Sequence, residues 1–194
     1  MTAKPDLPII PFASRDEWET WLDEHHGTSN GLRLKLARKN SGIDSVTLAE
    51  AVEVALCFGW IDSQADKFDD DYWLLRFTPR GTRSKWSQVN CKKVESLIEA
   101  GRMQRAGMRE IERAKSDGRW DAAYEPQSRA TVPEDLQREL DRNDGAAEFF
   151  GTLDSRNRYA ILHRIHDAKR PETRARRIEK YMTMLSKGET IYQS

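Results

Sequence analysis

Apolar residues first recur at helical spacing along the chain. Ser14, followed three residues later by Glu17, forms a capping box, and Trp18 and Leu22 then fall on one helical face. This pattern predicts a helix that ends near Gly27.

The spacing of the apolar residues then changes from helical to alternating. Leu32, Leu34 and Leu36 alternate with polar positions between Gly31 and Arg38. Strict alternation places these leucines on one side, so it predicts a half-buried strand.

A second capping box opens a second predicted helix. Thr47 and Glu50 precede an apolar stripe that includes Ala51 and Leu56, and Gly59 can end the helix in a left-handed conformation.

Two strand-like runs around an acidic turn predict an antiparallel hairpin. They span residues 60–66 and 72–78. If the loop is 68–70, Asp62 lies directly opposite Arg76, and this cross-strand charge pair would be favourable. The other reading is an ordinary surface pair.

Helical spacing returns after Pro79 and continues to the C-terminus. Ser84 is the expected cap of the next helix, which ends near Gly101, and another helix follows. Residues 120–131 lack a clear period and read as a linker. Pro133 is expected at the first position of a helix, and three more helices follow, the last opened by Pro171.

These patterns together predict an α+β fold. We expect an α+β domain over residues 1–125, in which a small antiparallel sheet packs with helices. An all-helical C-terminal subdomain is expected over 126–194.

Composition limits the compartment and the classes of partner. Lys plus Arg and Asp plus Glu number 32 each, so no global field attracts nucleic acid, and the basic run at 169–180 reads as a solvated helical face. Only Cys57 and Cys91 are present, without a CxxC pair, which fits a reducing cytosol. No apolar run approaches the ~20 residues of a membrane span. We expect a cytoplasmic protein without membrane insertion.

Three strings resemble those of the YdeI/OmpD-associated (bacteriocin-protection) family. They are ALCFGWID at 55–62, RFTPRGTRSKWSQVN at 76–90 and AKRPETRARRIEKYMTML at 168–185, so the resemblance runs nearly end to end. The resemblance implies a role in protection against bacteriocins and an N-terminal part similar to small frataxin-like α/β domains. It implies no established reaction, so no catalytic residue is assigned.

The strongest candidate site combines the predicted hairpin with the helix after Pro79. Basic side chains just before a helix N-terminus favour an anion such as phosphate or carboxylate. The predicted ligand-binding residues are Trp60, Asp62, Arg76, Arg80, Arg83, Lys85, Trp86, Ser87 and Asn90. The alternative is structural: the two tryptophans belong to the core, and Asp62, Arg76 and Asn90 fix the hairpin against the helix.

Other candidate residues carry weaker signals. Cys57 lies on an apolar helical face, where a thiol behaves as a small hydrophobe. His163 and His166 lack a metal-binding motif. The first helix has an acidic outer face that resembles the iron-binding ridge of frataxins, although helices often carry such faces without a ligand. We expect no metal and no cofactor.

Two functions follow from the sequence. The first, which we prefer, is a non-enzymatic stress or bacteriocin-protection factor that binds a small anionic ligand or a protein partner. The second is a metal (iron) carrier or small-molecule enzyme that uses the Asp62, Arg76 and Arg80 region or the acidic first helix. A concave pocket around Asp62, Arg76, Trp86 and Asn90 with a strongly perturbed carboxylate would favour the second.

Overall fold

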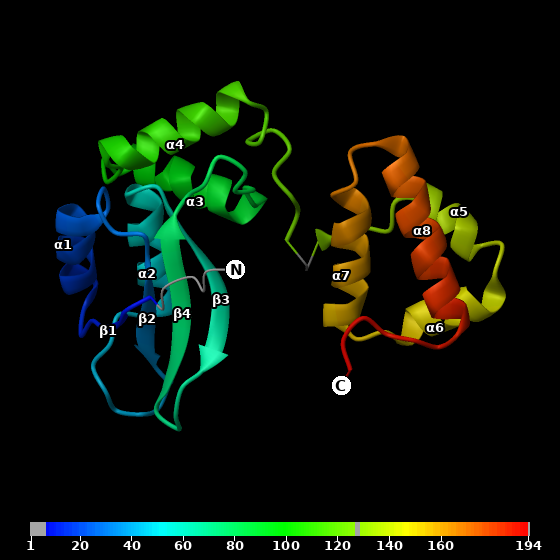
Figure 1. Cartoon of the computed structure of the whole chain (residues 1–194), viewed down its shortest axis with the longest axis horizontal. Coiled ribbons are helices and arrows are strands. Elements are labelled where there is room, and N and C mark those ends of the chain that lie inside the picture. Colours follow the sequence, from blue (N-terminus) through cyan, green and yellow to red (C-terminus); the bar gives the residue numbers. More distant parts are fainter. Residues whose placement is uncertain (1–6, 127–128, 194) are drawn as a thin grey trace, which may run out of the picture. The chain divides into compact units, whose positions relative to one another are not determined.

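The chain is an α+β protein that divides into two compact units. The computed structural model describes residues 7–126 and 129–193 (Figure 1). The first unit is Met1–Ala123 and the second is Tyr124–Ser194.

A four-stranded sheet forms the centre of the first unit. Its strands are β1 (Ile9–Pro11), β2 (Leu32–Ala37), β3 (Trp60–Lys67) and β4 (Tyr72–Pro79), in the order β1-β2-β4-β3. The predicted hairpin is confirmed as β3 and β4. The sheet is mixed rather than wholly antiparallel, because β1 pairs with β2 in parallel. A strand of three residues is too short to show a period, so the sequence pattern does not reveal β1.

Four helices accompany this sheet. They are α1 (Arg15–His25), α2 (Leu48–Cys57), α3 (Gln88–Glu99) and α4 (Arg105–Ser116). Both predicted N-caps are confirmed: the Ser14 side chain accepts from the Glu17 N–H, and Thr47 and Glu50 form a reciprocal capping box. Gly59 has φ +74°, which is the left-handed conformation expected at the end of α2.

The core of the first unit lies on one face of the sheet. Leu32, Leu34 and Leu36 point into it from β2, and α2 runs behind the strands in Figure 1. The predicted burial of Trp60 and Trp86 is confirmed, since they are 1% and 2% exposed. The second face of the sheet carries Arg33, Arg76 and Thr78, together with the buried Leu74.

The expected pairing of Asp62 with Arg76 is wrong. Asp62 lies opposite Phe77, and the register shifts at a bulge between Asp62 and Ala65. The hairpin loop is also longer than expected, because Lys67 pairs with Trp73. Loop length and bulges set the register of a hairpin, and neither has a clear signal here.

The helix after Pro79 begins later than expected. Its N-cap is Ser87, whose hydroxyl accepts from the Asn90 N–H at 3.1 Å, whereas the Ser84 hydroxyl accepts from the Gly81 N–H at 3.0 Å. Residues 80–86 consequently form a loop that precedes α3.

The second unit is helical in the part of it that the structure describes. Its helices are α5 (Glu134–Leu140), α6 (Asp144–Thr152), α7 (Ser155–His166) and α8 (Pro171–Ser186). Pro171 opens α8 as predicted, whereas Pro133 is the N-cap of α5 and lies one position before the helix. These helices enclose a second hydrophobic cluster that includes Leu136 and Ile161.

Two arginines of the basic run have structural contacts. Arg174 donates to the Ile165 carbonyl oxygen at 2.9 Å, and Arg177 donates to the Arg164 carbonyl oxygen. Both carbonyls belong to the last turn of α7, and the Ile165 carbonyl oxygen also accepts from the Ala168 N–H at 3.1 Å. The run therefore helps to hold α7 against α8.

Among the described residues, no helix combines the length and the apolarity that a membrane crossing demands.

Candidate functional site

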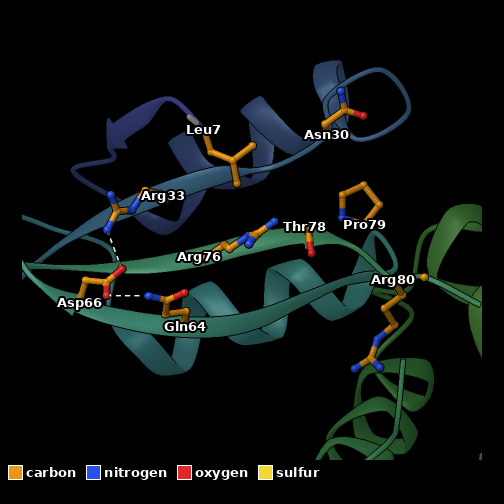
Figure 2. A pocket seen from close by; sticks show the side chains of 10 residues that line it. Leu7, Asn30, Arg33, Gln64, Asp66, Arg76, Thr78, Pro79 and Arg80 are labelled. Carbon is orange, nitrogen blue, oxygen red and sulfur yellow. Dashed lines mark hydrogen bonds and ion pairs between the residues drawn. The ribbon is translucent and has the colours of Figure 1, made fainter. Parts of the chain in front are cut away.

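A cleft lies on the sheet face opposite the core of the first unit. Its volume is about 730 Å³. Figure 2 shows its lining: Leu7, Asn30, Arg33, Gln64, Asp66, Arg76, Thr78, Pro79, Arg80 and Gly81. The alternation that buries Leu32 and Leu34 directs Arg33 to this face, and the alternation that buries Phe77 directs Arg76 and Thr78 here as well.

An ion pair crosses one end of the cleft. Arg33 Nη2 lies 2.6 Å from Asp66 Oδ2, and Gln64 Nε2 donates to Asp66 Oδ1 at 2.9 Å. The hydrogen bond from Gln64 contributes most to lowering the pKa of Asp66 below its usual value, and the hydrogen bond from Arg33 contributes next. Asp66 is therefore a carboxylate at neutral pH, and Arg33 is neutralised beside it.

Arg76 lies directly across from Arg33 in the register of β2 and β4. Like charges in directly opposite positions destabilise a sheet, but here the Asp66 carboxylate compensates the Arg33 charge. The Arg76 Nε is also buried, and it has no hydrogen-bond partner among the residues that the structure describes. A buried donor without an acceptor is costly, so an anion bound here would supply the acceptor that the Arg76 Nε lacks.

Arg80 has a different environment from Arg76, although both line the cleft. Its guanidinium carbon lies 3.7 Å from the centroid of the Trp86 ring, and its Nη1 donates to the Lys85 carbonyl oxygen at 3.1 Å. In Figure 2 its side chain turns away from Arg76. Arg80 therefore stabilises the loop at 80–86 from within.

Two more arginines hold the same loop from outside it. Arg113 donates to the Arg80 carbonyl oxygen at 3.4 Å, and Arg119 donates to the Ser84 carbonyl oxygen at 2.9 Å. The Trp86 ring also packs against Trp120, with centroids 4.9 Å apart. The loop beside the cleft is thus fixed by side chains from α4 and from the segment that follows it.

The nine residues predicted from the sequence do not gather in one place. Arg76 and Arg80 line the cleft, but Trp60 and Trp86 are core residues. The Trp60 indole donates to the His26 carbonyl oxygen at 3.3 Å.

The other five predicted residues lie outside the cleft lining. Ser87 and Asn90 form the cap of α3, Asp62 lies opposite Phe77, and Arg83 and Lys85 are exposed in the loop. A binding role for these residues stays a prediction.

Sequence reasoning did not select several residues that line the cleft. The missed polar residues are Asn30, Arg33, Gln64, Asp66 and Thr78. Alternation alone could have placed Arg33 on the solvent side of its strand. It could not have shown that β2 pairs with β4 in a register that brings Arg33 to Arg76, because strand pairing is a non-local property.

The described residues offer little for metal or thiol chemistry. No three His, Cys, Asp or Glu side chains in residues 7–126 and 129–193 gather as a metal site requires. Burial raises the pKa of the Cys57 and Cys91 thiols to about 11 each, so both are protonated at neutral pH. The expectation that Cys57 acts as a small hydrophobe is confirmed.

Two family models match the chain. The one described as Domain of unknown function (DUF8412) matches residues 10–110, and the one described as Bacteriocin-protection, YdeI or OmpD-Associated matches residues 129–188. The resemblance predicted nearly end to end is thus found in part: of the three strings, only that at 168–185 lies in the second match. No curated protein and no solved structure matches the chain, and the frataxin-like arrangement stays an expectation.

Proposed function

Because the chain belongs to the family of the model that matches residues 10–110, and carries a YdeI/OmpD-associated domain at 129–188, we propose that it is a non-enzymatic bacteriocin-protection or stress factor. It acts in the cytoplasm, by binding a small anionic ligand in the cleft on its sheet. The cleft of about 730 Å³ is within the usual size of small-molecule sites.

The observation that carries this proposal is the environment of Arg76. Its guanidinium lies opposite Arg33, and its Nε is buried without an acceptor in the described part of the chain. A bound carboxylate or phosphate oxygen would supply the missing acceptor and compensate the charge.

The enzyme alternative has less support from this geometry. A pocket around Asp62, Arg76, Trp86 and Asn90 would have favoured an enzyme. Of these four residues, Arg76 alone lines the cleft. The carboxylate that does line it, Asp66, has a lowered pKa and hence no proton to donate near neutral pH. These features suit binding better than acid catalysis.

Of the residues predicted from the sequence, Arg76 is assigned to the ligand. Arg80 and Trp86 are assigned to positioning the loop that borders the cleft. Binding should therefore be more sensitive to the Arg76 charge than to the exposed charges of Arg83 and Lys85.

A protein-observed NMR titration with acetate, benzoate and inorganic phosphate tests the binding site. At least one anion should shift the amide resonances of Arg76, Thr78 and Asn30. Arg76→Gln should abolish these shifts, while Arg109→Gln, the same change at an exposed position of α4, should keep them. Absence of any saturable shift in the wild-type protein would remove the proposal.

The protective role needs a cellular measurement. Bacteria that express the wild-type chain should survive a bacteriocin challenge better than bacteria that express Arg76→Gln, at equal protein levels. Equal survival of the two strains would show that ligand binding in the cleft is not needed for protection.

A further inference from the structure

The charge of the cleft is smaller than its number of arginines suggests. Arg33 is neutralised by Asp66 at 2.6 Å, and Arg80 is stacked on the Trp86 ring, with its guanidinium turned away from Arg76 in Figure 2. Among the described residues that line the cleft, Arg76 therefore supplies the positive charge at its centre.

Asp66 lies close enough to influence a ligand on Arg76. Asp66 pairs with Leu74, which is two positions before Arg76 on the same face of β4. Such diagonal neighbours are roughly 7–8 Å apart. A second negative charge on the ligand would have no cation of its own and would face the Asp66 carboxylate.

The other side of the cleft is suited to an uncharged group. Leu7, Thr78 and Pro79 line it, and Asn30 adds an amide (Figure 2). Leu7 and Thr78 both lie beside Gly31, where an added Cβ would come within 3.3 Å of Leu7 Cδ1 and 2.7 Å of Thr78 Cγ2. This wall is closely packed, so it can support a small apolar body.

We propose that the ligand is a monocarboxylate with a small apolar body, bound through Arg76, and that Asp66 selects against dianions such as phosphate monoesters. This inference rests on the proposed function and specifies the ligand class of the same cleft. The guanidinium plane offers parallel donors that match the two oxygens of a carboxylate. Asp66 supplies the repulsive element that specificity requires.

Three probes of similar shape and different charge test the inference. Benzoate carries one negative charge, phenyl phosphate carries two at pH 8, and benzamide carries none. Titration calorimetry at pH 8 and low salt should give tighter binding for benzoate than for phenyl phosphate. Benzamide should show no measurable binding, because it lacks the charge that Arg76 requires.

Removal of the Asp66 charge should change the selectivity. In Asp66→Asn, the ratio of phenyl phosphate affinity to benzoate affinity should rise about tenfold or more, since repulsion is lost and Arg33 becomes available. Asp70→Asn is the matched control, because Asp70 is fully exposed at the hairpin tip and outside the cleft lining. This control should leave the ratio unchanged.

The outcomes separate this inference from the proposed function. If no probe binds in the cleft, the proposed function fails together with the inference. If phenyl phosphate binds the wild-type protein more tightly than benzoate, or if Asp66→Asn leaves the ratio unchanged, anion binding stands and the selection by charge is overturned.

Thermal unfolding of Asp66→Asn, with or without benzoate, verifies that the variant is folded, and Gln64→Glu offers a second test. That variant adds a negative charge beside Asp66 and should further weaken phenyl phosphate relative to benzoate.

Discussion

At the scale of single residues, Trp86 connects the core with the loop beside the cleft. It is 2% exposed, packs against Trp120, and carries the Arg80 guanidinium on its ring. The same side chain thus contributes apolar burial and a cation–π contact.

Trp86→Ala should lower the free energy of unfolding by about 3 to 5 kcal/mol, because it leaves a cavity and removes both contacts. Urea unfolding followed by circular dichroism measures this. Phe68→Ala is the control, since Phe68 is 45% exposed and contacts Lys35 at 4.6 Å; it should cost about 1 kcal/mol or less. Equal midpoints for Trp86→Ala and the wild type would contradict the burial of this side chain.

At the scale of elements, α4 packs closely against the C-terminal end of α2. A Cβ added to Gly107 would lie 2.8 Å from the Leu56 carbonyl oxygen, which belongs to the α2 backbone. Only glycine allows the two helices this approach.

Gly107→Ala should therefore destabilise the first unit, although alanine normally favours a helix by about 1 kcal/mol over glycine. Gly151 in α6 is the control, because an added Cβ there meets nothing within 4 Å. Gly151→Ala should stabilise its own unit by about 0.4 to 1 kcal/mol. Calorimetric scans of both variants measure the two effects, and stabilisation by Gly107→Ala would contradict the close packing.

An ion pair links α5 to α8 within the second unit. Arg174 Nη2 donates to Asp135 Oδ1 at 2.8 Å, and Arg174 Nε lies 2.5 Å from Asp135 Oδ2. The hydrogen bonds from Arg174 lower the pKa of Asp135 in the folded state. The pair's contribution to stability is hence complete above the unfolded pKa of about 3.9 and is lost as pH falls through the lowered value.

Acidification should therefore cost the wild-type protein more stability than it costs Asp135→Asn. Urea unfolding at several values between pH 7 and pH 2.5 measures both proteins. The free-energy difference between them should shrink below about pH 4, because Asp135 of the unfolded chain takes up its proton there, whereas Asp135 of the folded protein does so only at a lower pH. If the free energies of unfolding of the two proteins change in parallel with pH, the ion pair between Asp135 and Arg174 does not contribute to folding stability.

At the scale of the whole molecule, two separate hydrophobic clusters hold the chain. The first includes Trp18, Leu34 and Phe77, and the second includes Leu136, Phe150 and Leu185. A unit with its own core can in principle fold alone. The predicted boundary between domains near residue 125 stays a prediction about independent folding.

Fragments 1–125 and 126–194 test that prediction when each is produced by itself. Each should unfold cooperatively in urea, and the larger fragment should keep the anion-induced NMR shifts of Arg76. The smaller fragment has 69 residues and a smaller core, so it should be the less stable of the two. A fragment that lacks a cooperative transition would place essential contacts across the boundary.

The sequence by itself determined the local structure and much of the burial. Capping residues such as Ser14 and Thr47 specify helix starts through bonds that span three residues, and alternation specifies which side of β2 is buried. The inward positions of Trp60 and Trp86 also followed from their apolar neighbours. These features are predictable because each depends on groups that are close along the chain.

Only the tertiary structure decided which charges meet in the cleft. Alternation places Arg33 and Arg76 on polar faces, but the pairing of β2 with β4 makes them direct neighbours. The bulge in β3 and the longer hairpin loop place Asp66, rather than Asp62, among these arginines. A change of one residue in register reverses the face of every side chain, so the pairing of the strands, which no single strand encodes, determines the composition of the site.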